Sequence, residues 1–234
     1  MPAPSGERDD LLTDESLSLN VAWLRLRLDP EHPAPKVDHL RAAIATVRPD
    51  LDLLHQHGQS GLIYRYPRVI YRIQDDGPLI VAVAEGIEAL LGLTLVGQGL
   101  RLGVTTRRII DATFHVQEHT LGPATTPRRY QLMTPWLALN QENHSRFGPM
   151  DKAQRQQLLD VQVANNCLSL AKSFGLRITT RLAGKAHVRP VPVWLKQVEM
   201  LGFLGVVEVN FQIPDGLGLG KSVSKGFGAV EGEK

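Results

Sequence analysis

The feature that most constrains the fold of this chain is an internal repeat: the pattern Trp-Leu-x-Leu occurs at residues 23–26 and again at residues 136–139. Four letters alone prove little. Each copy, however, is followed at a similar distance by a segment with helix-like spacing of apolar residues, at 35–47 and at 150–175. The repetition indicates that one supersecondary unit is present twice.

The second of these segments carries the clearer helix signals. Asp151 stands where an N-cap is expected, and Gly175 stands where the helix should end. Apolar residues recur between them at helical spacing, namely Leu159, Val163, Cys167, Leu170 and Phe174.

Strand-like runs follow each predicted helix. They lie at 61–74 and 79–84 in the first half of the chain, and at 176–184 and 205–214 in the second. A strand, a long helix and further strands, repeated, are the signature of two ferredoxin-like units. The sequence therefore predicts an α+β protein with two tandem ferredoxin-like (βαββαβ, RRM-like) domains, each an antiparallel sheet backed by helices.

The domain boundaries follow from composition. Residues 1–16 are acidic, and we expect them to form a flexible leader. The predicted N-terminal domain spans residues 17–122, and the predicted C-terminal domain spans residues 128–234. The joint is expected near 121–129, "LGPATTPRR", because proline and threonine are concentrated there.

Composition excludes several classes of protein. A hydrophobic content of 43% and a charged content of 21% are those of an ordinary globular protein. Glu85 and Glu88 interrupt the longest apolar run, so no membrane span is expected, and the polar start shows no signal peptide. Cys167 is the single cysteine, which excludes an internal disulfide and favours a reducing, cytoplasmic (prokaryotic) location.

The chain has a net charge of +2, but its charged residues are distributed unevenly along the sequence. Residues 1–16 carry a net charge of −4, residues 17–124 are balanced, and residues 125–234 carry a net charge of +6. A basic C-terminal half points to nucleic acid, although charge alone is equally compatible with a solvated mixed surface.

The C-terminal run "GLGLGKSVSKGFGAVE", residues 216–231, resembles a phosphate-binding loop at first sight. Gly220, Lys221 and Ser222 fit a P-loop, but Asp215 occupies the position of its first glycine and no helix follows. The spacing of Gly216, Gly218 and Gly220 does not match a dinucleotide fingerprint either.

A glycine-rich loop for an extended polyanion is the interpretation that remains. Its glycines would let a ligand approach the backbone, and Lys221 and Lys225 would supply charge. The alternative is a disordered glycine-rich end. Phe227 and Val230 argue against that alternative, because "GFGAVE" has the pattern of a short returning strand.

The densest group of reactive side chains lies at residues 51–67, "LDLLHQHGQSGLIYRYP". His55 and His57 are two positions apart, so an extended backbone points both to the same side with Cα atoms about 6.5–7 Å apart. One neutral and one protonated imidazole are what RNA cleavage without a metal requires. Tyr64, Arg65, Tyr66 and Arg68 offer donors for charge that develops on phosphorus, and Gly58 and Gly61 would let the RNA approach.

Two other interpretations of the histidine pair stay open. A metal site would need a third ligand, for which only the distant His115, His119 and His144 are available. The pair could also be two surface histidines in a loop without a chemical role.

Together these motifs resemble a known family. The closing "GLGLGKSVSKGFGAVE", the His-bearing "LLHQHG" with "YRYPRVIYR", and "PWLALNQEN", similar to a central strand, resemble the CRISPR-associated endoribonucleases that cut precursor CRISPR RNA within its repeats. These enzymes are members of the repeat-associated RAMP superfamily, and the resemblance extends over about residues 17–231.

The resemblance implies tandem ferredoxin-like folds and metal-independent attack by the ribose 2′-OH, without a cofactor, leaving a 2′,3′-cyclic phosphate and a 5′-OH. It implies that His55 and His57 are the catalytic pair and that the partner is CRISPR repeat RNA. A homodimer and contacts with other CRISPR effector subunits are compatible with it. The residues implied to contact RNA are Gly216, Gly218, Gly220, Lys221, Ser222, Lys225, Gly226, Phe227, Gly228, Arg65 and Arg68.

The sequence departs from the family in one respect. Many relatives use a tyrosine, a histidine and a lysine together, but no lysine lies between Lys36 and Lys152 here. The stabilising cation would then be Arg65, Arg68 or a lysine of the second domain. Some members of the superfamily bind RNA without cutting it, so a non-catalytic RNA-binding subunit of the same fold is the alternative.

Overall fold

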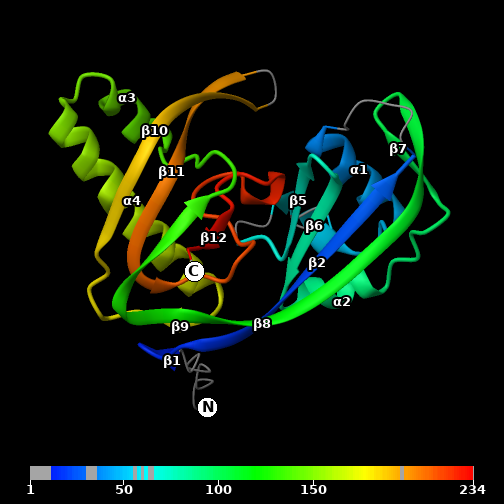
Figure 1. Ribbon diagram of the computed structural model, residues 1–234, viewed down its shortest axis with the longest axis horizontal. Coiled ribbons are helices and arrows are strands. Elements are labelled where there is room, and N and C mark those ends of the chain that lie inside the picture. Colours follow the sequence, from blue (N-terminus) through cyan, green and yellow to red (C-terminus); the bar gives the residue numbers. More distant parts are fainter. Residues whose placement is uncertain are drawn as a thin grey trace, which may run out of the picture.

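A computed structural model describes residues 12–29, 36–54, 57–58, 61–62, 66–195 and 198–233. Two mixed α/β units lie side by side, and one long strand passes through both (Figure 1). The helices are α1 (Val37–Val47), α2 (Glu85–Leu91), α3 (Gln141–Phe147) and α4 (Lys152–Ser173), with 3₁₀ turns η1 (Asp52–Leu54) and η2 (Val223–Lys225). No helix in these ranges is long and apolar enough to cross a membrane.

Within the described ranges, eight strands form one antiparallel sheet. They are β2 (Leu17–Leu28), β5 (Val69–Gln74), β6 (Gly77–Val83), β7 (Gly99–Leu102), β8 (Thr105–Leu132), β10 (Gly184–Leu195), β11 (Val198–Gln212) and β12 (Val230–Gly232). Two-residue strands form two further pairs, β1 (Leu12–Thr13) with β9 (Leu176–Arg177) and β3 (His57–Gly58) with β4 (Gly61–Leu62).

The strand order confirms the tandem ferredoxin-like prediction. In the first unit the order is β8-β2-β6-β5, and in the second unit it is β12-β8-β11-β10. Numbered along each unit, both orders are 4-1-3-2, the arrangement that βαββαβ connections give in an antiparallel sheet. Strand β8, 28 residues long, is therefore the last strand of the first unit and the first strand of the second.

The segment 121–129, where the joint between the two domains was expected, lies within the continuous strand β8. The partner of β8 changes there, from β2 up to Leu121 to β11 from Gly122 onward. The register with β11 shifts between Val209–Arg128 and Phe211–Pro123, so that residues 124–127 form a bulge. A bulge accommodates the Pro/Thr-rich run without breaking the strand.

The acidic leader differs partly from its prediction. Residues 1–11 lie outside the described residues, but Leu12 and Thr13 pair with β9. The Asp14 carboxylate accepts hydrogen bonds from the backbone N–H of Thr179 (2.7 Å) and of Thr180 (3.0 Å). The end of the leader is thus attached to the second unit.

The second Trp-Leu-x-Leu copy does not form a full strand as the first does. Trp23 lies within β2, whereas Trp136 follows β8 and makes a single bridge to Phe203 of β11. The Trp136 indole is fully buried and donates to Asn166 Oδ1 on α4 at 2.8 Å. The repeat therefore marks two core tryptophans in different local structures.

Helix α4 has the ends that were predicted for it. Asp151 caps its N-terminus in a capping box with Gln154, and Gly175 follows its C-terminus with φ +78°. The predicted apolar face packs against the second unit's sheet, with Leu159, Val163, Cys167 and Leu170 buried.

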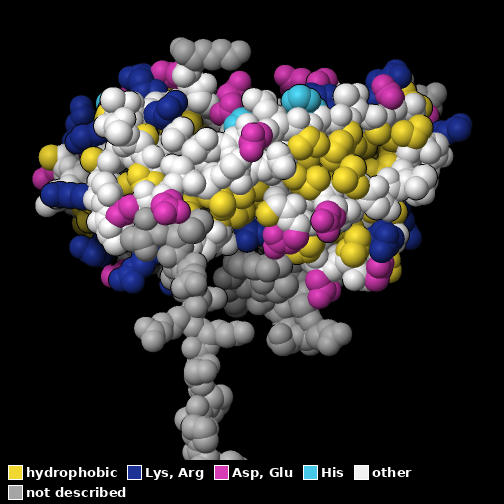
Figure 2. Space-filling view, turned by 90° about the horizontal axis from the view of Figure 1, so that it is seen from below, with side chains coloured by type: hydrophobic (Ala, Val, Ile, Leu, Met, Phe, Trp, Pro, Cys, Tyr) yellow, Lys and Arg dark blue, Asp and Glu magenta, His cyan; other side chains and the backbone are white. Residues whose placement is uncertain are grey.

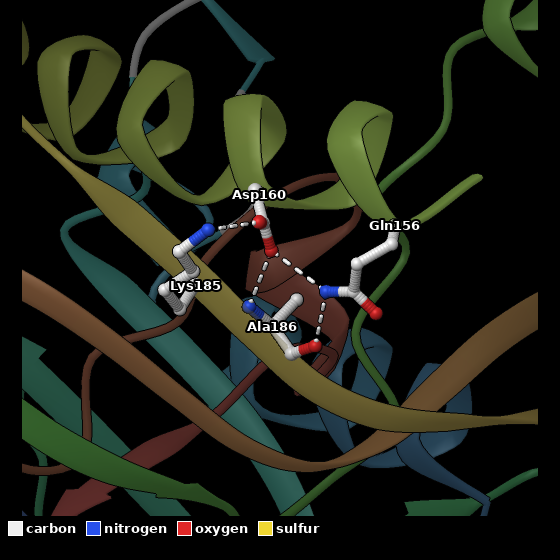
Figure 3. Close-up of polar contacts among 4 residues, drawn as sticks. All are labelled: Gln156, Asp160, Lys185 and Ala186. Carbon is white, nitrogen blue, oxygen red and sulfur yellow. Dashed lines mark hydrogen bonds and ion pairs between the residues drawn. The ribbon is translucent and has the colours of Figure 1, made fainter. Parts of the chain in front are cut away.

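A polar contact attaches α4 to the edge strand β10 (Figure 3). Asp160 accepts from Lys185 Nζ (2.9 Å), the Ala186 N–H (2.9 Å) and Gln156 Nε2 (2.8 Å). Burial alone would raise the pKa of Asp160, but these hydrogen bonds outweigh it and lower the pKa.

The two inner strands of the first unit's sheet, β2 and β6, have buried residues on both faces. One face holds Leu26 and Ile80 against α1, α2 and their neighbours. The opposite face holds Val21 and Val81 in a cluster shared with the second unit. Burial on both faces explains why β6 is apolar at nearly every position.

Candidate functional site

The glycine-rich segment 214–229 takes the place that a second helix occupies in a complete ferredoxin-like unit, between β11 and β12. It packs between the two units. Its backbone is fixed by hydrogen bonds from Lys221 N–H to Leu137 O (3.1 Å), from Gly228 N–H to Pro135 O (2.9 Å) and from Leu219 N–H to Gly228 O (2.9 Å). The segment is thus ordered rather than a disordered end.

The glycines of this segment contact the chain itself. A Cβ on Gly226 would lie 2.6 Å from Tyr71 O of the first unit, and one on Gly228 would lie 2.0 Å from Leu219 O. Both have positive φ, +85° and +67°, which side chains other than glycine rarely adopt. A Cβ on Gly216, Gly218 or Gly220 would likewise meet protein atoms, and Gly218 and Gly220 also line the cleft described below.

Tyr66 holds the segment from the first unit. Its hydroxyl donates to Gly218 O (3.1 Å) and accepts from Gly218 N–H (2.8 Å), so it pairs both backbone groups of a buried glycine. Burial raises the pKa of Tyr66, which therefore stays protonated at neutral pH.

Beside this contact lies a cleft of about 780 Å³. Tyr66 and Pro67 line it from the first unit, and α4 and the glycine-rich segment line it from the second. The contribution of α4 is mainly polar: Gln162, Asn166, Ser169 and Ser173 recur at helical spacing, and Leu170 is the apolar residue among them. The segment contributes Lys221 and Ser222, and Lys172 adds a second cation.

The chemistry of this lining suits a polyanion. Among the described residues that line the cleft, none is aspartate or glutamate, whereas amides, hydroxyls and two lysines are present. Lys221 is exposed, and no ion pair to it is found in the described part of the chain. Such donors can bind phosphate oxygens without competition from carboxylates.

The other predicted lysine is differently placed. Lys225 pairs with Asp38 of α1 at 2.8 Å, and its side chain is only 13% exposed. Its charge joins the segment to the first unit instead of facing the cleft. Phe227 is half-buried.

Arg68 does not fit the role predicted for it. Its side chain is 9% exposed, with Nε donating to Glu85 Oε1 (3.0 Å) and Nη2 donating to Ser173 O (2.8 Å). The guanidinium carbon also lies 4.0 Å from the centre of the Phe174 ring. Arg68 joins α2 to the end of α4, so we do not retain it as an RNA ligand.

The histidine pair lies largely outside the described residues. His55 and Arg65 are not described, and His57 is described only through its backbone, which pairs with Leu62 in the β3–β4 hairpin. Arg65 directly precedes Tyr66 in the sequence, and Tyr66 lines the cleft.

The more distant histidines are not in the cleft. His115 and His119 of β8 lie against the Trp23 ring, at centroid distances of 5.8 and 5.6 Å. Burial lowers the pKa of His119, although Asp215 opposes the shift. Within the described ranges no three potential ligands gather into a metal site.

Sequence reasoning missed the polar stripe of α4 and the anchoring role of Tyr66. The stripe could have been found, because Gln162, Asn166 and Ser169 recur at three- and four-residue spacing along one flank of the apolar face. The bond between Tyr66 and Gly218 joins residues 152 positions apart and has no local signal.

Comparison with known proteins agrees with this architecture. Family models of the Cas6b N-terminal domain and the Cas6b C-terminal domain match residues 17–120 and 122–232. A crystal structure of Cas6b is 30% identical with a TM-score of 0.83, over 93% of this chain and 100% of that chain. A crystal structure of a CRISPR RNA processing endoribonuclease Cas6b is 29% identical with a TM-score of 0.73, over the same shares.

A third relative is known from sequence. An uncharacterized protein of Methanocaldococcus jannaschii is 33% identical over 124 residues, which are 53% of this chain and 84% of that protein. The two domain models together span nearly all of the sequence, and their boundary falls where β8 changes partner. The chain belongs to the Cas6b family.

Proposed function

We propose that this protein is an endoribonuclease that processes precursor CRISPR RNA within its repeats. Membership of the Cas6b family supports the substrate class, since a similar solved structure is described as a CRISPR RNA processing endoribonuclease. The observation that carries the proposal is the cleft between α4 and the glycine-rich segment, whose described lining has lysines, amides and hydroxyls but no carboxylate.

RNA would be held mainly by the second unit. Lys221, Lys172 and the amides of Gln162 and Asn166 offer donors to consecutive phosphates along the cleft. Ser222 adds a hydroxyl. Phe227, which is half-buried, would contribute through its exposed part, against a sugar or base next to the cleft. Lys225 and the loop glycines act indirectly, by holding the segment in place.

His55 and His57 would carry the chemistry. The neutral imidazole removes the proton of a ribose 2′-OH, whose oxygen attacks the adjacent phosphorus. The protonated imidazole gives its proton to the departing 5′-oxygen, so the products are a 2′,3′-cyclic phosphate and a 5′-OH. No metal takes part in this scheme.

The charge that develops on phosphorus needs a cation. Because the Arg68 side chain is engaged by Glu85 and Ser173, the candidates are Arg65 and the cleft lysines, above all Lys221. The first unit (predicted over 17–122) would supply the histidines, and the second unit (predicted over 128–234) would supply most of the RNA contacts.

The engagement of Arg68 also favours a second candidate function, a subunit that binds repeat RNA without cutting it. The two functions are separated by measuring binding and single-turnover cleavage of repeat RNA on the same variants. For the nuclease, His55→Ala or His57→Ala abolishes cleavage and leaves binding within a few-fold. For the carrier, the unaltered protein binds but does not cut, and only Lys221→Ala has an effect.

A further inference from the structure

Tyr71 of β5 carries a buried hydroxyl that takes no part in the proposed cleavage scheme. Hydrophobic side chains of the first unit gather on one face of the molecule (Figure 2), but Tyr71 is only 1% exposed and lies in the cluster that also contains Leu54. The Tyr71 hydroxyl donates a hydrogen bond to Leu54 O at 2.8 Å. Burial raises the pKa of Tyr71, so the hydroxyl keeps this proton at neutral pH.

The acceptor of this bond stands directly before the histidine pair in the sequence. Leu54 is the last residue of η1 and is fully buried, and His55 follows it. η1 also lies close to β3, which begins at His57. Because a peptide group is planar, the orientation of the Leu54 carbonyl sets the direction in which the chain continues. The Tyr71 hydroxyl therefore fixes the start of the segment that contains both histidines.

η1 alone holds this point weakly. It is a single 3₁₀ turn, closed by a bond from the Leu54 N–H to Leu51 O (3.0 Å), and hydrogen bonds in such turns are poorly aligned. The Leu54 carbonyl stands at the C-terminal end of the turn, where carbonyls have no partner within the helix. The Tyr71 hydroxyl supplies that partner from β5, which pairs with β6 along its full length. The bond therefore attaches the end of η1 to a strand of the sheet.

The main chain of Tyr71 contacts the glycine-rich segment. A Cβ on Gly226 would lie 2.6 Å from Tyr71 O, so the segment lies directly against β5 at this residue. η2, which starts immediately after Ser222 of the cleft, lies against β5 and against α1. Tyr71 thus contacts the glycine-rich segment through its backbone and the histidine-bearing segment through its side chain.

We propose that Tyr71 is a positioning residue for RNA cleavage, which through Leu54 holds His55 and His57 in a fixed place relative to the glycine-rich segment. This inference rests on the proposed function, because that function gives the histidines their role. Tyr71 itself is not a catalytic residue, since its hydroxyl is buried and donates to the protein. A general acid and a general base act only at hydrogen-bond distance, and a displacement of about 1 Å can cost about 100-fold in rate.

Tyr71→Phe tests this role, because it removes the hydroxyl and keeps the buried ring. Single-turnover cleavage of repeat RNA over a range of protein concentrations separates the maximal rate from the half-saturating concentration. The maximal rate should fall about 10- to 100-fold, whereas the half-saturating concentration should stay within about two-fold, because the lining of the cleft is unchanged.

Tyr130→Phe is the matched control. It also removes a buried hydroxyl that binds backbone groups, Phe211 O and the Ile213 N–H, but these groups lie in the second unit. Tyr130→Phe should leave the maximal rate unchanged at a temperature where thermal unfolding shows both variants and the unaltered protein to be folded. An unchanged maximal rate in Tyr71→Phe, or an equal fall in Tyr130→Phe, would overturn the proposal.

NMR of the histidine imidazoles tests the positioning without relying on cleavage. Tyr71→Phe should shift the ring C–H signals of His55 and His57, assigned with His55→Ala and His57→Ala, whereas His144 of α3 in the second unit should keep its signal. If the unaltered protein binds repeat RNA without cutting it and these signals still shift, the proposed nuclease function fails but the hold of Tyr71 on the histidines stands. Signals of His55 and His57 that do not move would refute the positioning role, whether or not the protein cuts RNA.

Discussion

The double hydrogen bond between Tyr66 and Gly218 gives a specific prediction about how the cleft is held. Tyr66→Phe removes only the hydroxyl and leaves the N–H and C=O of the buried Gly218 without their partner. An unsatisfied buried polar group costs about 1–3 kcal/mol, so we expect a loss of roughly 2–6 kcal/mol for the two together. At this chain length that corresponds to a fall in Tm of about 4–24 °C.

Tyr130→Phe is the matched control. The Tyr130 hydroxyl likewise donates to one backbone carbonyl, Phe211 O (3.0 Å), and accepts from one N–H, that of Ile213 (2.9 Å). Burial raises the pKa of Tyr130 to about 12. This pair lies at the end of β11 and not in the cleft, so Tyr130→Phe should lower the stability by a similar amount.

The affinity for RNA should distinguish Tyr66→Phe from Tyr130→Phe. Because Tyr66 positions the glycine-rich segment, Tyr66→Phe should weaken binding of repeat RNA several-fold, whereas Tyr130→Phe should not change it. Urea unfolding and a filter-binding titration measure both quantities on the same samples. If the two variants lose stability equally and bind RNA equally well, the segment is not part of the RNA site.

Three further predictions concern the second unit. Asp160→Asn should lower the free energy of unfolding at neutral pH. Because the native pKa of Asp160 is lowered, its carboxylate stabilises the fold above pH about 4, and this stabilisation is lost as the pH falls through the native pKa. The difference in the free energy of unfolding between the variant and the unaltered protein should therefore disappear in urea titrations at acid pH. Gly228→Ala, with its Cβ 2.0 Å from Leu219 O, should cost about 3 kcal/mol or more, whereas Gly148→Ala, with open space around it, should cost less than about 1 kcal/mol; equal values would refute the role given to Gly228. Lys221→Ala should weaken RNA binding for all sequences and reduce the slope of log K against log salt by about 1; an unchanged slope would place Lys221 away from the phosphates.

The elements that could be predicted from sequence are those with local signals. Helix α4 is fixed by the Asp151 cap, the Gly175 stop and one apolar face, all within a few turns. The tandem fold followed from the repeated order of such elements. Strand β10 was missed because Pro190 and Pro192 argue against a strand, but β10 is at the sheet edge, where a missing N–H is tolerated.

Much of the candidate site depends on tertiary contacts instead. The glycine-rich run signals a close backbone approach, but only the fold shows that Gly226 approaches Tyr71 and not a ligand. An arginine near a histidine pair is a reasonable phosphate ligand by sequence, yet Arg68 lies against Phe174, more than a hundred positions away. Residue type therefore indicated the chemistry of the region, and long-range packing decided which side chains face the cleft.

The most direct test of the proposed function is single-turnover cleavage of repeat RNA in EDTA, with one 2′-deoxynucleotide placed in turn at each position of the repeat. We predict a single cut, abolished by one deoxy substitution on the 5′ side of the scissile phosphate, and a product ending in a 2′,3′-cyclic phosphate. Cleavage that needs an added divalent metal, or that persists through every deoxy substitution, would contradict attack by the 2′-OH and the roles assigned to His55 and His57.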